Sequence, residues 1–196
     1  MFKKLTIGAV ALVLPLGALA APESYTVDPT HTFPHFEVSH FGVSNWRGRF
    51  EKTTGKFTID RAAKAGSVDI TVQTASLSSG DHDKGARPRS LDDHLRTPDF
   101  FNVAEFPTMT YKSNAVKFTG DNPVSIEGNL TLLGVTKPLI LRVENWKCMA
   151  HPFNKKEMCG GNASGSFKRT DFGMKFLVPA VSDETKLWIQ IEGYKD

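Results

Sequence analysis

The sequence predicts an all-β fold, an antiparallel β-barrel, and two observations support this prediction. Short runs rich in aromatic and β-branched residues alternate with polar residues at a period of two, which is the pattern of strands that bury one face. Glycine, aspartate or proline separates these runs, as expected for the turns of an antiparallel sheet. Strands of a parallel sheet are apolar on both faces, so the polar face of many runs favours an antiparallel barrel.

The first 20 residues predict a cleaved secretory signal peptide. Lys3 and Lys4 precede an apolar run over Leu5–Leu19, and Ala18-Leu19-Ala20 has the small residues of a cleavage site. The run is short for a membrane span of about 20 residues, and a retained anchor is the alternative. Residues 21–196 are expected to form one exported domain, because no linker or repeat divides them.

The exported domain carries almost no net charge. Without Lys3 and Lys4 the formal charge falls from +3 to +1. A near-neutral protein offers no global electrostatic attraction for nucleic acid, so no nucleic-acid partner is expected.

The predicted strands begin with Tyr25–Val27, which ends where Asp28-Pro29 interrupts it. In the later strands, one set of alternating residues is apolar or small and is expected to face the interior. These inward sets are Phe36, Val38 and His40; Trp46, Gly48 and Phe50; Gly55, Phe57 and Ile59; Val68, Ile70 and Val72; Ala163, Gly165 and Phe167; and Leu187, Ile189 and Ile191. Two more strands are predicted at Met109–Ser113 and Ala115–Phe118, so that about eight to ten strands are expected in all.

The clearest element is a β-hairpin over Gly128–Val143. Gly134 can adopt the backbone angles of a turn, and Pro138 fits only at a strand start or a sheet edge. A buried helix, the alternative, would be interrupted by both residues. The inward side chains of the two arms are Leu130 and Leu132, then Leu139, Leu141 and Val143.

A short helix is predicted over residues 90–96, between two sets of strands. Ser90 is a suitable N-cap, and Pro98 prevents much further helix. An aromatic cluster of Phe100, Phe101 and Phe106 follows at once. The helix and this cluster are expected to plug or line one end of the barrel.

The two cysteines, Cys148 and Cys159, are expected to form a disulfide, as pairs of cysteines in exported proteins commonly do. A bridge across so short a loop contributes roughly 2–3 kcal/mol by restricting the unfolded chain. The alternative is a metal site that includes His151, but a fourth ligand at zinc-like spacing is missing.

Common catalytic and metal-binding signatures are absent from the sequence. Ser164 has the wrong position for a nucleophile elbow, and no glycine-rich phosphate loop occurs. His31 and His35 would lie roughly 13 Å apart along a strand, so we expect no metal site and interpret both as structural or mouth-lining.

The 14 phenylalanines allow two interpretations of the barrel interior. A barrel of about eight strands is just wide enough to be filled by its own side chains or to hold one small ligand. A long apolar ligand would replace part of the core, with polar groups fixing its head at the mouth. His94 and Arg96, with Arg87 and Arg89 nearby, are the candidates for that polar end, and a solvated loop is the alternative.

Several motifs together resemble the YceI family of secreted, lipocalin-like polyisoprenoid-binding proteins. The most specific are Asp93–Phe101 (DHLRTPDFF), Gly128–Pro138 (GNLTLLGVTKP) and Lys168–Met174 (KRTDFGM). The resemblance implies an extended eight-stranded antiparallel barrel with one short helix and an internal hydrophobic tunnel. It also implies a long-chain isoprenoid ligand, such as a polyprenyl pyrophosphate, an isoprenoid quinone like ubiquinone, or a similar amphiphile.

The site residues follow from the inward strand faces and from the positions that match the family's aromatic stretch. The residues expected to line the tunnel are Phe36, Val38, Phe50, Phe57, Ile70, Leu95, Phe100, Phe101, Phe106, Tyr111, Leu130, Leu132, Leu141, Phe167, Phe172, Leu187 and Ile189. The residues expected to hold the head group at the mouth are His31, His94, Arg96 and Asp99.

We therefore expect a periplasmic lipid-binding protein that sequesters or transports such a lipid, with no catalytic step and no cofactor. One alternative is an enzyme or stress-response factor that acts on the lipid head group at the barrel mouth. The other is a cavity-free β interaction module. The expected partner is the lipid, with a transient membrane contact, and the protein is expected to be a monomer or a homodimer.

Overall fold

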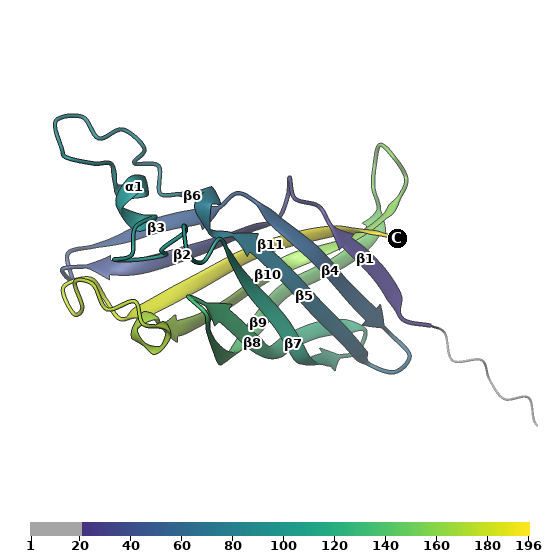
Figure 1. Cartoon of the computed structure of the whole chain (residues 1–196). Helices are drawn as coiled ribbons and strands as arrows, with labels where there is room; N and C mark the ends of the chain where they lie inside the picture. The colour runs from purple at the N-terminus through teal and green to yellow at the C-terminus, as the bar shows by residue number, and fades with distance from the viewer. Residues whose placement is uncertain (1–20) are drawn as a thin grey trace, which may run out of the picture.

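The computed structural model describes residues 21–196, so the predicted signal peptide lies outside the described residues (Figure 1). The described chain contains one α-helix, α1 (Leu91–Leu95), and two short 3-10 helices, η1 (Thr74–Ser76) and η2 (Arg169–Phe172). Its strands are β1 (Glu23–Val27), β2 (Phe33–His40), β3 (Ser44–Phe50), β4 (Thr53–Asp60), β5 (Ala65–Gln73), β6 (Leu77–Ser78), β7 (Thr108–Thr119), β8 (Asn122–Leu132), β9 (Val135–Ala150), β10 (Glu157–Lys168) and β11 (Glu184–Lys195).

Eight of these strands close into an antiparallel barrel. They pair in the order β1-β4-β5-β7-β8-β9-β10-β11, and β11 pairs again with β1, for example at Thr26 and Tyr194, to complete the ring. The predicted fold class is therefore confirmed: an all-β, eight-stranded antiparallel barrel with one short helix.

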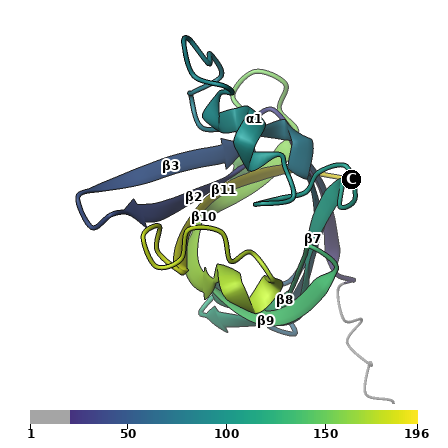
Figure 2. The ribbon, with the colours of Figure 1, turned by 60° about the vertical axis from the view of Figure 1, so that its left-hand side comes forward.

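The other three strands, β2, β3 and β6, continue barrel strands beyond a break. β2 follows β1 after Asp28–Thr32, β3 leads into β4, and β6 follows β5 after η1. The carboxylate of Asp28 accepts hydrogen bonds from the amide and the hydroxyl of Thr30, at 2.8 and 2.6 Å, and this turn interrupts the strand where the sequence predicts. The wall flares at this end, where β2 and β3 project from the ring (Figure 2).

We call this end of the barrel the capped end, because α1 lies across it (Figure 2). The hydroxyl of Ser90 accepts a hydrogen bond from the amide of Asp93, as expected of the N-cap. Asp92 is buried, and its carboxylate accepts hydrogen bonds from the amide and the hydroxyl of Ser79, at 2.8 and 2.6 Å. Asp92 therefore fastens the helix to the chain that leaves β6.

The hairpin over Gly128–Val143 is confirmed as β8 and β9, joined at the capped end. Leu133 and Gly134 both have positive φ, 51° and 73°, which suits the tight turn between two antiparallel strands. Pro138 pairs with Asn129 of β8 and lies beyond the last residue pair between β9 and β10, so its missing amide leaves no ladder bond unmade.

Two predicted boundaries differ in the structure. The strands predicted at Met109–Ser113 and Ala115–Phe118 form one strand, β7, with an irregularity at Asn114. β9 extends to Ala150, so that Cys148 lies directly opposite Cys159 of β10. The disulfide between these two cysteines is confirmed.

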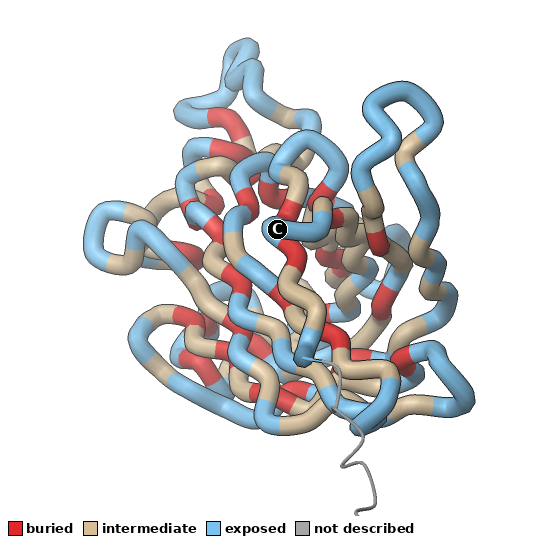
Figure 3. The backbone as a smooth tube through the Cα atoms, turned by 90° about the vertical axis from the view of Figure 1, so that its right-hand side faces the viewer, coloured by how far each residue is buried: buried red, intermediate tan, exposed pale blue. Residues whose placement is uncertain are grey.

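Buried residues alternate with less buried ones along the strands, as Figure 3 shows. Along β8, for example, Gly128, Leu130 and Leu132 are buried, while Asn129 and Thr131 are only half-buried. Within residues 21–196, no helix has both the length and the apolar character needed to cross a bilayer.

Candidate functional site

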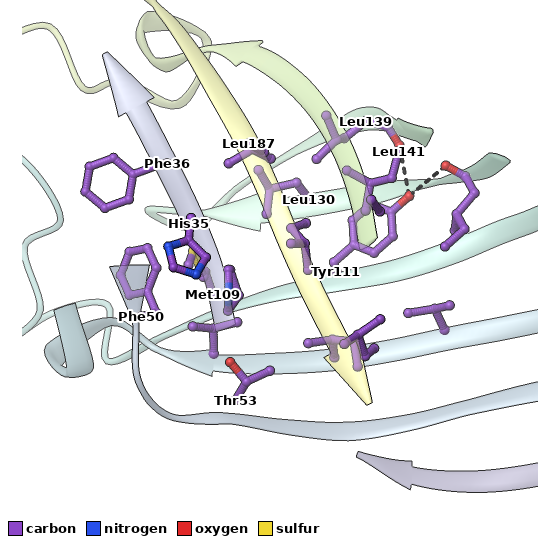
Figure 4. A pocket seen from close by; sticks show the side chains of 18 of the residues that line it. His35, Phe36, Phe50, Thr53, Met109, Tyr111, Leu130, Leu139, Leu141 and Leu187 are labelled. Carbon is purple, nitrogen blue, oxygen red and sulfur yellow. Dashed lines mark hydrogen bonds between the residues drawn. The ribbon is translucent and has the colours of Figure 1, made fainter. Parts of the chain in front are cut away.

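The barrel interior contains an apolar cavity that runs along the barrel. Its volume is about 180 Å³. The lining reaches from Leu95 and Phe101 at the capped end to Phe118 and Trp146 towards the opposite end. The lining part of β7 runs from Met109 to Phe118, which is about 30 Å of strand. This corresponds to about 23 Å along the axis of a barrel whose strands tilt by about 40°. We call this cavity the tunnel, and Figure 4 shows side chains that line it.

The structure places nearly all of the expected lining residues around the tunnel. Those that line it are Phe36, Val38, Phe50, Phe57, Ile70, Leu95, Phe100, Phe101, Tyr111, Leu130, Leu132, Leu141, Phe167, Leu187 and Ile189.

Two expected lining residues, Phe106 and Phe172, do not line the tunnel. The ring of Phe106 packs on the β8–β9 turn, where a Cβ atom added to Gly134 would lie 3.0 Å from it. Phe172 is buried behind Phe167, with 5.2 Å between the ring centroids.

Aromatic rings narrow the capped end of the tunnel. The ring of Phe101 lies 5.3 Å from that of Phe50 and 6.0 Å from that of Phe36. Gly48 makes this packing feasible, because a Cβ atom there would come within 2.5 Å of the Phe36 ring. Of the aromatic cluster expected to plug or line one end of the barrel, Phe100 and Phe101 line the tunnel and Phe106 does not.

The hydroxyl of Tyr111 is held by the backbone rather than offered to the tunnel. It lies 3.1 Å from the carbonyl of Ile126 and 3.0 Å from that of Leu139 (Figure 4). The lack of a side chain at Gly128 leaves room for this hydroxyl. Burial raises the pKa of Tyr111 well above its ordinary value, so the group stays neutral and donates.

At the opposite end, charged groups surround the last aromatic rings. Tyr25 stacks on Phe57 at 5.0 Å, and its hydroxyl donates to Glu157 at 2.9 Å. Burial, followed by that hydrogen bond, raises the pKa of Tyr25 to about 12. Lys195 donates to Glu23 at 2.6 Å and thereby lowers the pKa of that carboxyl.

The residues expected at the mouth separate into two groups. His94 and Asp99 come together, 2.8 Å apart, and the ring of His94 also lies 5.0 Å from that of Phe100. Arg96 lies nearby but donates to the carbonyl of Leu77 at 2.8 Å, so it fixes the helix to β6.

His31 does not join the other expected mouth residues. It lies in the break between β1 and β2, is 57% exposed and pairs with Asp28 at 2.8 Å. Its place is set by the turn that breaks the strand, and it does not line the tunnel.

Arg169 is a tunnel residue that the sequence interpretation missed. Its side chain is 2% exposed and makes four hydrogen bonds, all to backbone carbonyls. The acceptors are Met174 at 3.2 Å and Phe176, Val181 and Ser182 at 2.8 Å. Burial lowers the pKa of Arg169 from its ordinary value. The KRTDFGM motif contains this residue, but nothing in the motif shows that its partners are carbonyls of the following loop.

The other polar residues that line the tunnel include His35 and Thr53. Burial, followed by the nearby charge of Arg49, lowers the pKa of His35, which favours its neutral form. Thr53 is fully buried. It continues the inward set of Gly55, Phe57 and Ile59 by one position, so the alternation could have identified it.

In the described part of the chain, no three His, Cys, Asp or Glu side chains come close enough together to hold a metal ion. Cys148 and Cys159, the cysteines of the alternative metal site, are joined to each other.

Comparisons with known proteins agree with the fold and extend over the whole barrel. The sequence profile of the YceI-like domain matches residues 25–193. The YceI protein of Salmonella arizonae is 35% identical over 186 residues, which cover 93% of this chain and 92% of that one.

Two solved structures resemble the barrel. The crystal structure of BcnA from Burkholderia cenocepacia has a TM-score of 0.66 at 22% identity and covers 85% of this chain and 98% of that one. A polyisoprenoid binding domain from Saccharophagus degradans, implicated in plant cell wall breakdown, has a TM-score of 0.61 at 16% identity, with 88% and 98% covered. At these identities the likeness establishes the fold.

Proposed function

Since the chain belongs to the YceI-like family, we propose that it binds a long-chain isoprenoid lipid in its tunnel and sequesters or carries that lipid in the periplasm. The observation that carries this proposal is the apolar tunnel, which follows the barrel from Leu95 to Trp146. The Saccharophagus degradans neighbour, described as a polyisoprenoid binding domain, supports the same class of ligand.

The hydrophobic effect supplies the affinity in this proposal. Each buried methylene contributes about 0.8 kcal/mol, so a five-carbon isoprene unit contributes about 4 kcal/mol. Ordering the tail and losing the freedom of the ligand offset part of that sum. A tail of several units is nevertheless held firmly without strong head-group contacts, which suits a lining whose accessible surface is almost entirely apolar.

Export to the periplasm is supported by two features of the chain. The apolar run Leu5–Leu19 ends in a cleavage pattern. The disulfide between Cys148 and Cys159 is of the kind that persists in oxidising compartments.

Binding explains the site better than the two alternatives do. An enzyme acting on the lipid head would use His94, Arg96 and Asp99 together, whereas Arg96 is committed to backbone carbonyls and His94 packs between the rings of Phe100 and Phe176. A cavity-free interaction module is at odds with the apolar tunnel.

We also propose that the capped end contacts the membrane while lipid is exchanged. Two neighbouring loops there expose large apolar side chains, and the amide of Phe41 joins the loops by donating to the carbonyl of Ala180 at 2.7 Å. The exposed side chains are Phe41, Val43, Phe176 and Leu177. Val181, in the same loop as Ala180, lines the tunnel, so the apolar surface continues into the cavity. Lys175 is exposed beside these side chains and suits anionic lipid head groups.

The proposal is tested by purifying the protein from the periplasm of its own cells and extracting it with organic solvent. Mass spectrometry then identifies the extracted lipid and measures its amount per protein. We expect close to one isoprenoid lipid per chain. Recovery of no stoichiometric lipid would contradict the proposal.

Two variants of β10 locate the lipid in the tunnel. Ala163 is buried and lines the tunnel, whereas its neighbour Ser164 does not. Ala163→Phe adds six carbons to the tunnel and displaces about as many tail carbons, which removes up to about 5 kcal/mol of tail burial. This variant is expected to fold and to lose its lipid, while Ser164→Phe is expected to keep it. Equal lipid content in the two variants would place the ligand elsewhere.

A further inference from the structure

Thr53 is the unusual polar group of the tunnel. Among the buried side-chain nitrogen and oxygen atoms of residues 21–196, only its hydroxyl oxygen lacks a hydrogen-bond partner. A buried hydroxyl normally finds a partner in the protein or in ordered water, and one without a partner is costly. The Tyr111 hydroxyl in the same wall is satisfied by two carbonyls, so the position of Thr53 stands out.

The position of Thr53 directs its side chain to the tunnel. It begins β4 on the same face as Phe57 and Ile59, which are buried and line the tunnel, while Thr54 and Lys56 on the other face are exposed. Figure 4 shows Thr53 among the lining side chains. A rotation about its Cα–Cβ bond moves the hydroxyl to another staggered position, which can present it to a bound ligand.

The rest of the lining restricts the kind of group that can meet this hydroxyl. The basic residues of the lining are His35 and Arg169, and four donor contacts of Arg169 already go to carbonyls. Neither residue offers the set of free donors that a diphosphate needs when it leaves water. An uncharged oxygen, by contrast, needs a single hydrogen-bonding partner.

We propose that the Thr53 hydroxyl is a specificity-determining group that hydrogen-bonds an uncharged oxygen, a quinone carbonyl or an alcohol, on a prenyl lipid drawn into the tunnel. This inference rests on the proposed function and extends it. The oxygen-bearing end of the lipid then lies inside the barrel, and lipids with such an end are preferred over a prenyl chain that carries a diphosphate.

The test compares three ligands that share a geranylgeranyl chain: the alcohol, the corresponding hydrocarbon and the diphosphate. Each is titrated into the delipidated full-length mature protein and into Thr53→Val, which keeps the shape of the side chain and removes the hydroxyl. Thr53→Ser restores the hydroxyl, and Thr54→Val makes the same change one residue along the strand on the exposed face.

The expected result is selective. Thr53→Val should weaken binding of the alcohol about tenfold, or about 1.4 kcal/mol, and leave the hydrocarbon and the diphosphate within about twofold of wild type. Thr53→Ser and Thr54→Val should retain the affinity for the alcohol. Thermal unfolding of ligand-free Thr53→Val should match or exceed wild type, because the variant no longer buries an unpaired hydroxyl.

Two other outcomes overturn the inference, and they separate it from the proposed function. If wild type binds the prenyl ligands and Thr53→Val affects all three equally or none, the role of Thr53 is refuted and the lipid-binding function stands. If wild type binds none of the three, the lipid-binding function fails and the inference fails with it.

Discussion

Replacing Arg169 by methionine tests whether this buried residue holds the capped end together. The guanidinium makes four hydrogen bonds to carbonyls of the loop that precedes β11. At about 1.5 kcal/mol for each charge-assisted bond, their loss costs about 6 kcal/mol. Methionine carries no charge, so the variant avoids about 2 kcal/mol of the cost of burying a cation. The expected net destabilisation is therefore about 4 kcal/mol.

The assay is unfolding by heat and by urea, with two comparison variants. For a domain of this size, 1 kcal/mol corresponds to about 2–4 °C, so Arg169→Met should lower the Tm by about 8–16 °C. Arg169→Lys keeps the charge but cannot reach all four carbonyls, and it should fall between wild type and Arg169→Met. Arg142→Met changes an exposed arginine on β9 and should stay within about 0.5 kcal/mol of wild type. An Arg169→Met protein within about 1 kcal/mol of wild type would refute this account of the capped end.

Three further predictions concern the tunnel wall, the strand break and the membrane contact. Tyr111→Phe removes the hydroxyl that reaches two carbonyls. It should lower the free energy of unfolding by about 1 kcal/mol and the Tm by about 2–4 °C. An unchanged Tm in calorimetry would show that the carbonyls find other partners. The Asp28 hydrogen bond raises the pKa of His31, so the pair stabilises the fold below about pH 6.5 and loses this effect as pH rises through the raised pKa. His31→Ala should therefore cost more stability at about pH 5.5 than at about pH 8.5, by no more than about 0.5 kcal/mol because the His31 side chain is exposed. Urea titrations that give equal costs at the two pH values would disprove this. Phe176→Ser should slow lipid transfer from anionic vesicles several-fold. The control Phe153→Ser changes an 88% exposed residue on the β9–β10 turn and should leave the transfer rate unchanged. Equal transfer rates for the two variants would argue against a membrane contact at the capped end.

The local pattern of the sequence predicts most of the wall. Alternation at a period of two identifies the strands because each wall strand has one face against the tunnel and one towards solvent. Gly134 and Pro138 locate the hairpin for backbone reasons that hold in any fold. Ser90 identifies the start of the helix because its side chain satisfies an amide three residues away.

The parts that were missed depend on contacts between distant segments. Phe106 follows the aromatic cluster in sequence, but the chain turns so that its ring meets the β8–β9 turn and not the tunnel. His31 and His94 are both expected at the mouth, yet His31 lies in the break between β1 and β2 whereas His94 lies on α1, and the structure does not bring them together. The carbonyls that hold Arg169 belong to a loop without a recognisable pattern, so no local rule links them to the guanidinium.

The central claim is that the barrel encloses a lipid tail. The most direct measurement is a crystal structure of the protein purified from its own periplasm, with electron density examined along the tunnel. The account predicts one continuous, chain-shaped feature that runs from Phe101 towards Trp146, between the faces of the lining side chains. A tunnel closed by the protein's own phenyl rings, or one that holds only separate water molecules, would contradict it.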